Sequence, residues 1–160
     1  MDTRTGIHPL ASIGGFPEAR EWIADPARPF HEPTIDPSAL INAFVTVDSG
    51  CERSTTVGAR TFLMAHVHVG HDALIGADCE LAPHTTVGGW VELEDGVKVG
   101  VGATILPFRH IGAGATIGAG AVVTKHVPAG EVWAGNPAKA IGPKNAVPYT
   151  ARDEERTSIG

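Results

Sequence analysis

The chain has 160 residues, of which 20 are Gly and 12 are Pro, and 42% are hydrophobic. That length suits one domain with its own core, and a formal net charge of −6 argues against nucleic-acid binding. No apolar run approaches the ~18 residues of a membrane helix, and the N-terminus lacks the apolar core of a signal peptide. Two cysteines, Cys51 and Cys79, are too few for a disulfide framework. We therefore expect a cytoplasmic protein with neither a membrane nor a nucleic-acid partner.

A six-residue repeat dominates the chain. Between Val57 and Val123 an aliphatic residue returns every six positions without a miss. A helix of 3.6 residues per turn does not produce this period, and strand alternation would not keep the glycines that often follow in phase. We expect those glycines to adopt positive φ at turns, and the small residue four places after each aliphatic position to point inward. The aliphatic positions are Val57, Leu63, Val69, Ile75, Leu81, Val87, Leu93, Val99, Ile105, Ile111, Ile117 and Val123.

The N-terminal segment shows a related pattern with one long interruption. The stretch from Ile7 to Gly14 reads as a first repeat unit. Residues 14–34 form an excursion from the repeat, because the spacing to the next aliphatic positions is not a multiple of six. Within the excursion, 17–22 predicts a short helix with Pro17 in its first turn.

The period resumes at Ile35 and runs to Val47, and it then slips within residues 52–56, which predicts a short loop. Another register, through Val45 and Cys51, would avoid the slip. The sequence leaves both registers open.

The repeat ends after Val127-Pro128, and a segment rich in turn residues, 135–139, follows it. Residues 143–160 form a polar tail. We therefore divide the chain into one domain at 1–142 and a tail at 143–160.

The pattern resembles the hexapeptide repeat of left-handed parallel β-helix proteins. In that fold three hexads make one triangular coil, so residues 18 apart stack in neighbouring coils about 4.8 Å apart. The resemblance implies an all-β, single-domain solenoid. Since the family is mostly trimeric, it also implies a homotrimer with active sites in the grooves between subunits.

A histidine cluster carries the more specific motif. His68, His71 and Asp72 lie within five residues, and Gly89 stands 18 positions after His71. Acyl transfer from a thioester needs a base for the acceptor and a donor for the oxyanion, and imidazole beside a carboxylate suits the first task. A glycine at 89 leaves its backbone N–H accessible to a thioester oxygen.

The segment from Phe44 to Gly89 resembles the UDP-N-acetylglucosamine O-acyltransferase family, and it is similar to sugar O- and N-acetyltransferases. The resemblance implies that His71 is the general base, supported by Asp72, and that the Gly89 N–H binds the oxyanion. It also implies that His68 contacts the acceptor, a sugar and in particular a nucleotide-linked amino sugar.

The C-terminal coils resemble the coenzyme A end of hexapeptide acetyltransferases. Their many small residues leave a narrow groove suited to a pantetheine arm. The chain ends soon after this segment and lacks the helical C-terminal domain of the lipid A O-acyltransferases, which favours acetyl-CoA over acyl carrier protein as donor. Residues that match CoA contacts are Ala119, Thr124, Lys125 and Lys139.

The excursion occupies the place of a family loop that touches the sugar nucleotide. Glu18, Arg20 and Trp22 are therefore candidate substrate-binding residues. The acceptor-binding Asp of the family is replaced by Ala19, and its Lys by Glu21. These departures leave the acceptor unidentified.

Two further departures lie near the catalytic motif. Trp90 stands where the lipid A enzymes have His, and we include it among the substrate-binding candidates. Arg109 occupies a normally small inward position in a segment one residue shorter than in the family, which predicts a local bulge over 106–110.

Three alternatives remain. An acyl-carrier-protein-dependent transfer to a UDP-amino sugar shares the same chemistry. A metal enzyme like the γ-class carbonic anhydrases is disfavoured, because Gly76 stands where a second ligand is needed; His66 and His84 are expected to stack but do not close a site, so we expect no metal. A non-catalytic β-helix scaffold is the third.

Overall fold

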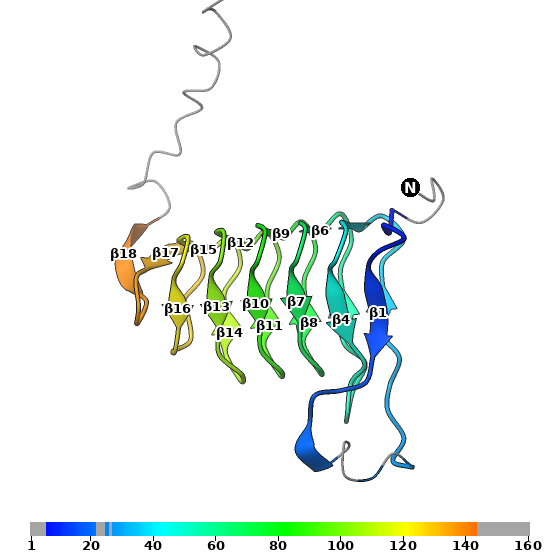
Figure 1. Cartoon of the computed structure of the whole chain (residues 1–160). Helices are drawn as coiled ribbons and strands as arrows, with labels where there is room; N and C mark the ends of the chain where they lie inside the picture. The colour runs from blue at the N-terminus through cyan, green and yellow to red at the C-terminus, as the bar shows by residue number, and fades with distance from the viewer. Residues whose placement is uncertain (1–5, 22–24, 26, 144–160) are drawn as a thin grey trace, which may run out of the picture.

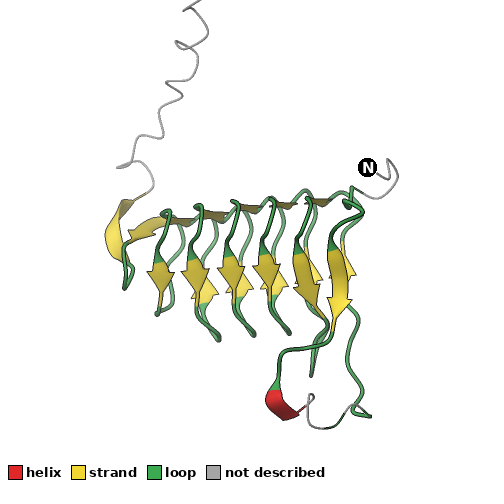
Figure 2. Ribbon diagram, viewed as in Figure 1, coloured by secondary structure: helices red, strands yellow, loops and turns green. Residues whose placement is uncertain are grey.

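A computed structural model describes residues 6–21, 25 and 27–143, and in it the chain winds into a solenoid with three flat faces (Figures 1 and 2). The first face consists of β1 (Ser12–Gly15), β4 (Thr46–Asp48), β7 (His68–Val69), β10 (Thr86–Val87), β13 (Thr104–Ile105) and β16 (Val122–Val123). The second face consists of β2 (Thr34–Ile35), β5 (Thr56–Val57), β8 (Leu74–Ile75), β11 (Glu92–Leu93) and β14 (His110–Ile111). The third face consists of β3 (Leu40–Ile41), β6 (Phe62–Leu63), β9 (Glu80–Leu81), β12 (Lys98–Val99), β15 (Thr116–Ile117), β17 (Glu131–Ala134) and β18 (Lys139–Pro143).

The chain visits the three faces in turn, so each strand pairs with the strand one coil away. Along the first face His68 pairs with Thr86, and Thr86 with Thr104, all in parallel register 18 residues apart. The all-β, left-handed parallel β-helix expected from the repeat is confirmed. The repeat ends after Val127-Pro128, as expected, and a hairpin that the sequence did not predict follows, in which β17 and β18 pair antiparallel.

The interior is filled by the residues that carry the period. All the aliphatic positions from Val57 to Val123 are buried, and so are the residues four places after them, with Arg109 as the exception. Each fully buried aliphatic side chain contributes roughly 1.5–3 kcal/mol to folding. The solenoid is therefore stabilised coil by coil.

The expected role of the glycines is wrong. Positive φ occurs two residues later, at positions such as Arg60, His66 and Asp72, which form the corners of the triangle. The glycines serve close approach instead. A Cβ on Gly58 would lie 2.5 Å from the carbonyl carbon of Gly76 in the next coil, so only glycine allows the coils to stack there.

The corner between the third and first faces carries a column of stacked rings. Phe44 and His66 have ring centroids 4.9 Å apart, and His66 and His84 have centroids 4.7 Å apart with an interplanar angle of 6°. The expected stacking of the two histidines is confirmed.

The slip predicted at 52–56 is real. Ile35 pairs with Val57, and Val47 with Val69, each 22 residues apart instead of the 18 of later coils. The register through Val45 and Cys51 is therefore not adopted. The extra residues form a loop at the corner between the first and second faces, here named the corner loop (residues 49–55).

The bulge predicted over 106–110 is absent. Glu92 pairs with His110, and Leu93 with Ile111, so the 18-residue register continues. Arg109 lies beside a corner and is only partly buried, and its Nε donates a hydrogen bond of 3.1 Å to the exposed carbonyl of Pro107. A long side chain at this position therefore avoids the interior without disturbing the ladder.

The excursion projects from the same corner as the corner loop (Figure 1). His31 and Gly50 exchange backbone hydrogen bonds of 2.8 Å, which tie the two segments together. Helical conformation begins at Arg20 rather than at Pro17 (Figure 2), and Trp22 lies outside the described residues. The tail from residue 144 onward also lies outside them. In the described part of the chain, no helix has the length and apolarity needed to cross a membrane.

Candidate active site

The histidine–aspartate pair predicted from the motif forms at the corner after β7. His71 Nδ1 lies 2.7 Å from Asp72 Oδ2. The His71 side chain is 19% exposed and that of Asp72 is fully buried. Asp72 occupies a corner position with φ 59°, which turns the backbone and directs its carboxylate back to the ring of the preceding residue.

The corner loop surrounds the Asp72 carboxylate with hydrogen-bond donors. The Cys51 N–H donates to Oδ2 at 2.9 Å, and the N–H groups of Glu52 and Arg53 donate to Oδ1 at 2.8 Å. The Asp72 N–H donates in turn to Thr55 Oγ1 at 2.9 Å. Burial would raise the pKa of Asp72, but the hydrogen bonds from the loop and from His71 outweigh it and hold the pKa below its ordinary value.

An ionised Asp72 determines what His71 can do. The carboxylate accepts a hydrogen bond from the protonated Nδ1 of His71, so the lone pair of the neutral ring lies on Nε2. Cys51 does not compete for the base role: burial and the neighbouring Asp72 raise the pKa of its thiol to about 12. The pair therefore presents a single basic atom, His71 Nε2.

Gly89 lies directly against the ring of His71. A Cβ at residue 89 would stand 2.7 Å from His71 Nε2, so any larger residue would displace the imidazole. Among the described residues the Gly89 N–H has no hydrogen-bond acceptor. An N–H without an acceptor, on a residue whose Cα side faces the basic nitrogen, is a candidate oxyanion donor.

Trp90 lies one coil beyond Asp72 in the same corner column. It stacks on Phe108 with centroids 6.2 Å apart, and the guanidinium of Arg53 lies 4.9 Å from its ring centroid. Arg53 also pairs with Glu92 at 2.9 Å. Trp90 thus forms an aromatic wall next to the pair, consistent with its place among the predicted site residues.

On the other side of the pair, His68 lies between Thr46 and Asp48. Its Nδ1 is 2.8 Å from Thr46 Oγ1, and its Nε2 is 3.9 Å from Asp48 Oδ2. Glu18 of the excursion reaches the same cluster. Burial raises the pKa of Asp48, with His68 opposing and Glu18 adding to the rise. Arg20 is exposed.

Sequence reasoning missed Asp48 and the loop amides. The signal for Asp48 was the register: once the 22-residue spacing of the slipped coil is known, Thr46 stands opposite His68 and Asp48 follows two residues later. The donors to Asp72 are backbone N–H groups, whose positions cannot be predicted from residue type.

Three of the four residues expected to contact CoA come together near the C-terminal hairpin. Thr124, Lys125 and Lys139 line a pocket of about 260 Å³, together with Trp133 and the segment 137–140. Ala119 does not line this pocket; it is exposed at the turn before β16.

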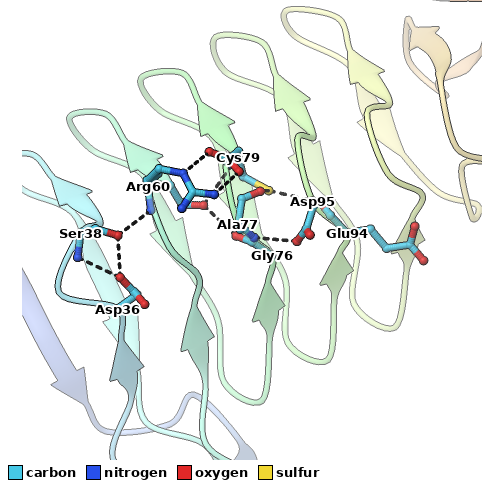
Figure 3. Close-up of polar contacts among 10 residues, drawn as sticks. Asp36, Ser38, Arg60, Gly76, Ala77, Cys79, Glu94 and Asp95 are labelled. Atoms are coloured by element: carbon cyan, nitrogen blue, oxygen red, sulfur yellow. Dashed lines mark hydrogen bonds and ion pairs between the residues drawn. The ribbon is translucent and has the colours of Figure 1, made fainter.

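A separate polar ladder follows the corner between the second and third faces (Figure 3). Ser38 Oγ donates to Asp36 and accepts from the N–H of Arg60, whose guanidinium forms two hydrogen bonds, of 2.7 and 2.6 Å, with Asp78. In the next coil Asp95 accepts the N–H of Ala77 at 2.8 Å. These contacts link successive coils on the surface and do not include the histidine pair.

Comparisons with known proteins bear on the repeat and the fold. The family model for bacterial transferase hexapeptide repeats matches residues 54–89 and 91–125. This part of the chain resembles the hexapeptide-repeat transferases. The resemblance expected from the repeat and the histidine motif is thereby confirmed.

Two relatives of this chain are named as nucleotide-sugar acyltransferases. It is 42% identical over 107 residues to the UDP-3-O-acylglucosamine N-acyltransferase of Caulobacter sp. (strain K31), which covers 67% of the chain and 32% of the relative. It is 38% identical over 156 residues to the acyl-[acyl-carrier-protein]–UDP-N-acetylglucosamine O-acyltransferase of Nautilia profundicola, covering 96% of the chain and 58% of the relative. LpxA of Acinetobacter baumannii superposes with a TM-score of 0.82 at 25% identity, covering 96% of this chain and 57% of that one.

Proposed function

We propose that this chain transfers an acyl group, acetyl in the first instance, from a CoA thioester to a hydroxyl or amine of a nucleotide-linked amino sugar. The observation that carries the proposal is the His71–Asp72 pair with Gly89, whose N–H has no acceptor among the described residues, packed against the imidazole. The names of the relatives support the reaction class. The chain spans between about a third and three fifths of their length.

The proposed chemistry uses three groups of this chain. His71 Nε2 removes the proton from the acceptor hydroxyl or amine as its oxygen or nitrogen bonds to the thioester carbonyl carbon. The Gly89 N–H donates to the oxyanion that forms, and the ionised Asp72 stabilises the imidazolium. When the intermediate collapses, the carbon–sulfur bond breaks and the thiolate takes the proton from His71.

The pocket near the C-terminal hairpin supports CoA as the donor. Lys125 and Lys139 provide two cations that suit phosphate groups, and Thr124 adds a hydroxyl. The second candidate donor is acyl carrier protein, which appears in the name of the Nautilia relative. Rates measured with matched acetyl and longer acyl groups on CoA and on acyl carrier protein separate the two.

We also propose that the active unit is a homotrimer with sites between subunits. A groove of about 480 Å³ on the second face is lined by residues including Glu92 and His110. It leaves room for a face of a neighbouring subunit. Sedimentation equilibrium of the full chain measures the subunit number directly.

The decisive experiment measures thiol release from acetyl-CoA with a panel of nucleotide amino sugars. We expect acceptor-dependent release that collapses in His71→Ala. His84→Ala, which removes an exposed imidazole at another corner, is the matched control and should retain activity.

Two outcomes would contradict the proposal. No release with any acceptor, together with no binding of CoA or of acyl carrier protein, would indicate a scaffold. Transfer that is unchanged in His71→Ala would remove the assignment of the base.

A further inference from the structure

A second cluster of polar side chains lies beside the catalytic pair. It comprises Glu18 on the excursion, Asp48 at the end of β4, and His68 in β7. One oxygen from each carboxylate and one ring nitrogen of His68 all lie within 4.8 Å of one another. The proposed acyl transfer gives no task to either carboxylate.

Asp48 is unsatisfied in this cluster. Its side chain is only 9% exposed, and within the described residues its Oδ2 has no hydrogen-bond partner. The nearest ring nitrogen, His68 Nε2, is 3.9 Å away, which is too far for a hydrogen bond. Because a buried carboxylate oxygen without a donor is destabilising, the cluster offers a strong acceptor to a donor from outside the chain.

We propose that Glu18, Asp48 and His68 together bind a protonated amino group of the acyl acceptor. This inference rests on the proposed function, since it assigns the recognition of that reaction's acceptor. An ammonium group has three N–H donors, and tetrahedral donors at about 2.8 Å place their acceptors ~4.6 Å apart. The three atoms of the cluster all lie within 4.8 Å of one another, and His68 Nε2 is 3.9 Å from Asp48 Oδ2, so the N–H donors of one ammonium group can reach all three.

The hydrogen bond of His68 to Thr46 is compatible with this role. When His68 Nδ1–H donates to Thr46 Oγ1 at 2.8 Å, Nε2 keeps its lone pair and becomes the third acceptor. The charged and titratable groups that act on Asp48 are His68, Glu18 and His71. The subsite therefore carries two negative charges when both histidines are neutral, which favours a cation over a neutral hydroxyl.

The spacing between two of the ligand atoms lies between the value expected for a bare metal ion and the ~4.6 Å expected for an ammonium, so a chelator arm in the test separates the two occupants. Oxygen and nitrogen ligands at about 2.0–2.4 Å from a divalent ion lie roughly 3–3.5 Å from each other. The separation between His68 Nε2 and Asp48 Oδ2 is 3.9 Å.

The amino group bound here is an anchor and not the atom that is acylated. Two carboxylates raise the pKa of a bound amine and keep it protonated, which removes the lone pair needed for attack. The reacting atom must face His71 Nε2, which lies against Gly89 in the following coil, whereas Asp48 belongs to the preceding coil. The acceptor therefore carries a free amino group in addition to the hydroxyl or amine that is acylated.

The test uses two nucleotide sugars that differ only in whether one amino group is free or N-acetylated. Acyl transfer is measured with wild type, Glu18→Gln, Asp48→Asn and the control Glu80→Gln, whose carboxylate is exposed on the third face and pairs with Lys98. We expect wild type to show a KM at least tenfold lower for the free amine. Glu18→Gln and Asp48→Asn should each raise that KM about tenfold, and should raise the KM of the N-acetylated sugar by much less.

Calorimetric binding of the same two sugars to wild type and Glu18→Gln tests the inference without transfer. Glu18 is exposed, so this variant does not depend on refolding of the core. Equal affinities for both sugars, or acylation of the anchoring nitrogen itself, would overturn the inference while His71-dependent transfer stood. A preference that a chelator abolishes and Mn²⁺ restores would assign the cluster to a metal ion instead and would likewise overturn it.

Discussion

Two histidine–carboxylate pairs lie close together: His71 and Asp72 at the corner after β7, and His68 of β7 with Asp48 at the end of β4 in the preceding coil. Asp72 accepts hydrogen bonds from three loop N–H groups and touches His71 at 2.7 Å, whereas Asp48 Oδ2 has no partner in the described structure and stands 3.9 Å from His68. Burial opposes ionisation of both carboxyls, yet the pKa of Asp72 is lowered and that of Asp48 is raised. The larger number of backbone donors around Asp72 therefore explains why the two pKa values move in opposite directions.

The largest expected effect separates the two histidines by the step that each serves. His71→Gln removes the base, so kcat should fall about 10²–10⁴-fold. His68→Gln removes only an acceptor contact, so it should change mainly the KM of the sugar. Steady-state kinetics with the sugar varied at saturating donor distinguishes these effects, and equal losses of kcat in both variants would remove the distinction.

Gly89→Ala tests whether the position of the His71 imidazole matters for catalysis. The added Cβ would stand 2.7 Å from His71 Nε2 and must displace the imidazole, so we expect roughly a 10²-fold loss of kcat. Gly102→Ala, at another corner, is the control, because a Cβ on residue 102 meets no atom within 4 Å. The φ of 66° at Gly102 adds backbone strain to this variant. Full activity in Gly89→Ala would contradict the packed geometry.

Replacing each carboxyl by the isosteric amide should change the free energy of unfolding differently at the two sites. Asp72→Asn places an amide among donors that need an oxygen, so the free energy of unfolding should drop by about 1–3 kcal/mol. Asp48→Asn removes a buried charge of which one oxygen, Oδ2, lacks a donor in the described structure, so unfolding in urea near neutral pH should show little loss of stability. A large destabilisation by Asp48→Asn would show that this carboxylate is already satisfied.

The smallest expected effect is the dependence of these differences on pH. The pKa of Asp72 is lowered in the folded state, so its stabilisation is present above its ordinary value of 3.8 and is lost as the pH falls through the folded pKa. The pKa of Asp48 is raised, so its favourable contribution is present below 3.8 and is lost as the pH rises through the folded value. Urea titrations at several pH values should therefore show the Asp72→Asn deficit shrinking only in strong acid, and any Asp48→Asn gain shrinking as the pH falls toward 3.8.

Much of this arrangement could be predicted from the sequence, because a strict period converts spacing into contact. The 18-residue interval alone placed Gly89 beside His71 and stacked His66 on His84. The same reasoning failed where local geometry decides. It assigned positive φ to the wrong position of the hexad, and it expected a bulge at Arg109, whose side chain instead turns toward the exposed carbonyl of Pro107.

The polar surroundings of the two pairs lay beyond the sequence for another reason. The donors to Asp72 are main-chain N–H groups of 51–53, and their direction depends on how four additional residues close a corner. Asp48 enters the site only through the register of that lengthened coil. Both depend on loop conformation, which periodicity does not encode.

The corner loop has a consequence for how such chains diversify. Because every coil returns to the same three walls, residues can be inserted at a corner without shifting the ladder: the pairing of Val47 with Val69 restores the columns at once. The three faces thus keep their strand register, and the length of each corner can vary independently. In this chain a few inserted residues supply the amides that support Asp72. An insertion at one corner can therefore create a new site while the strand pairing of the other coils stays unchanged.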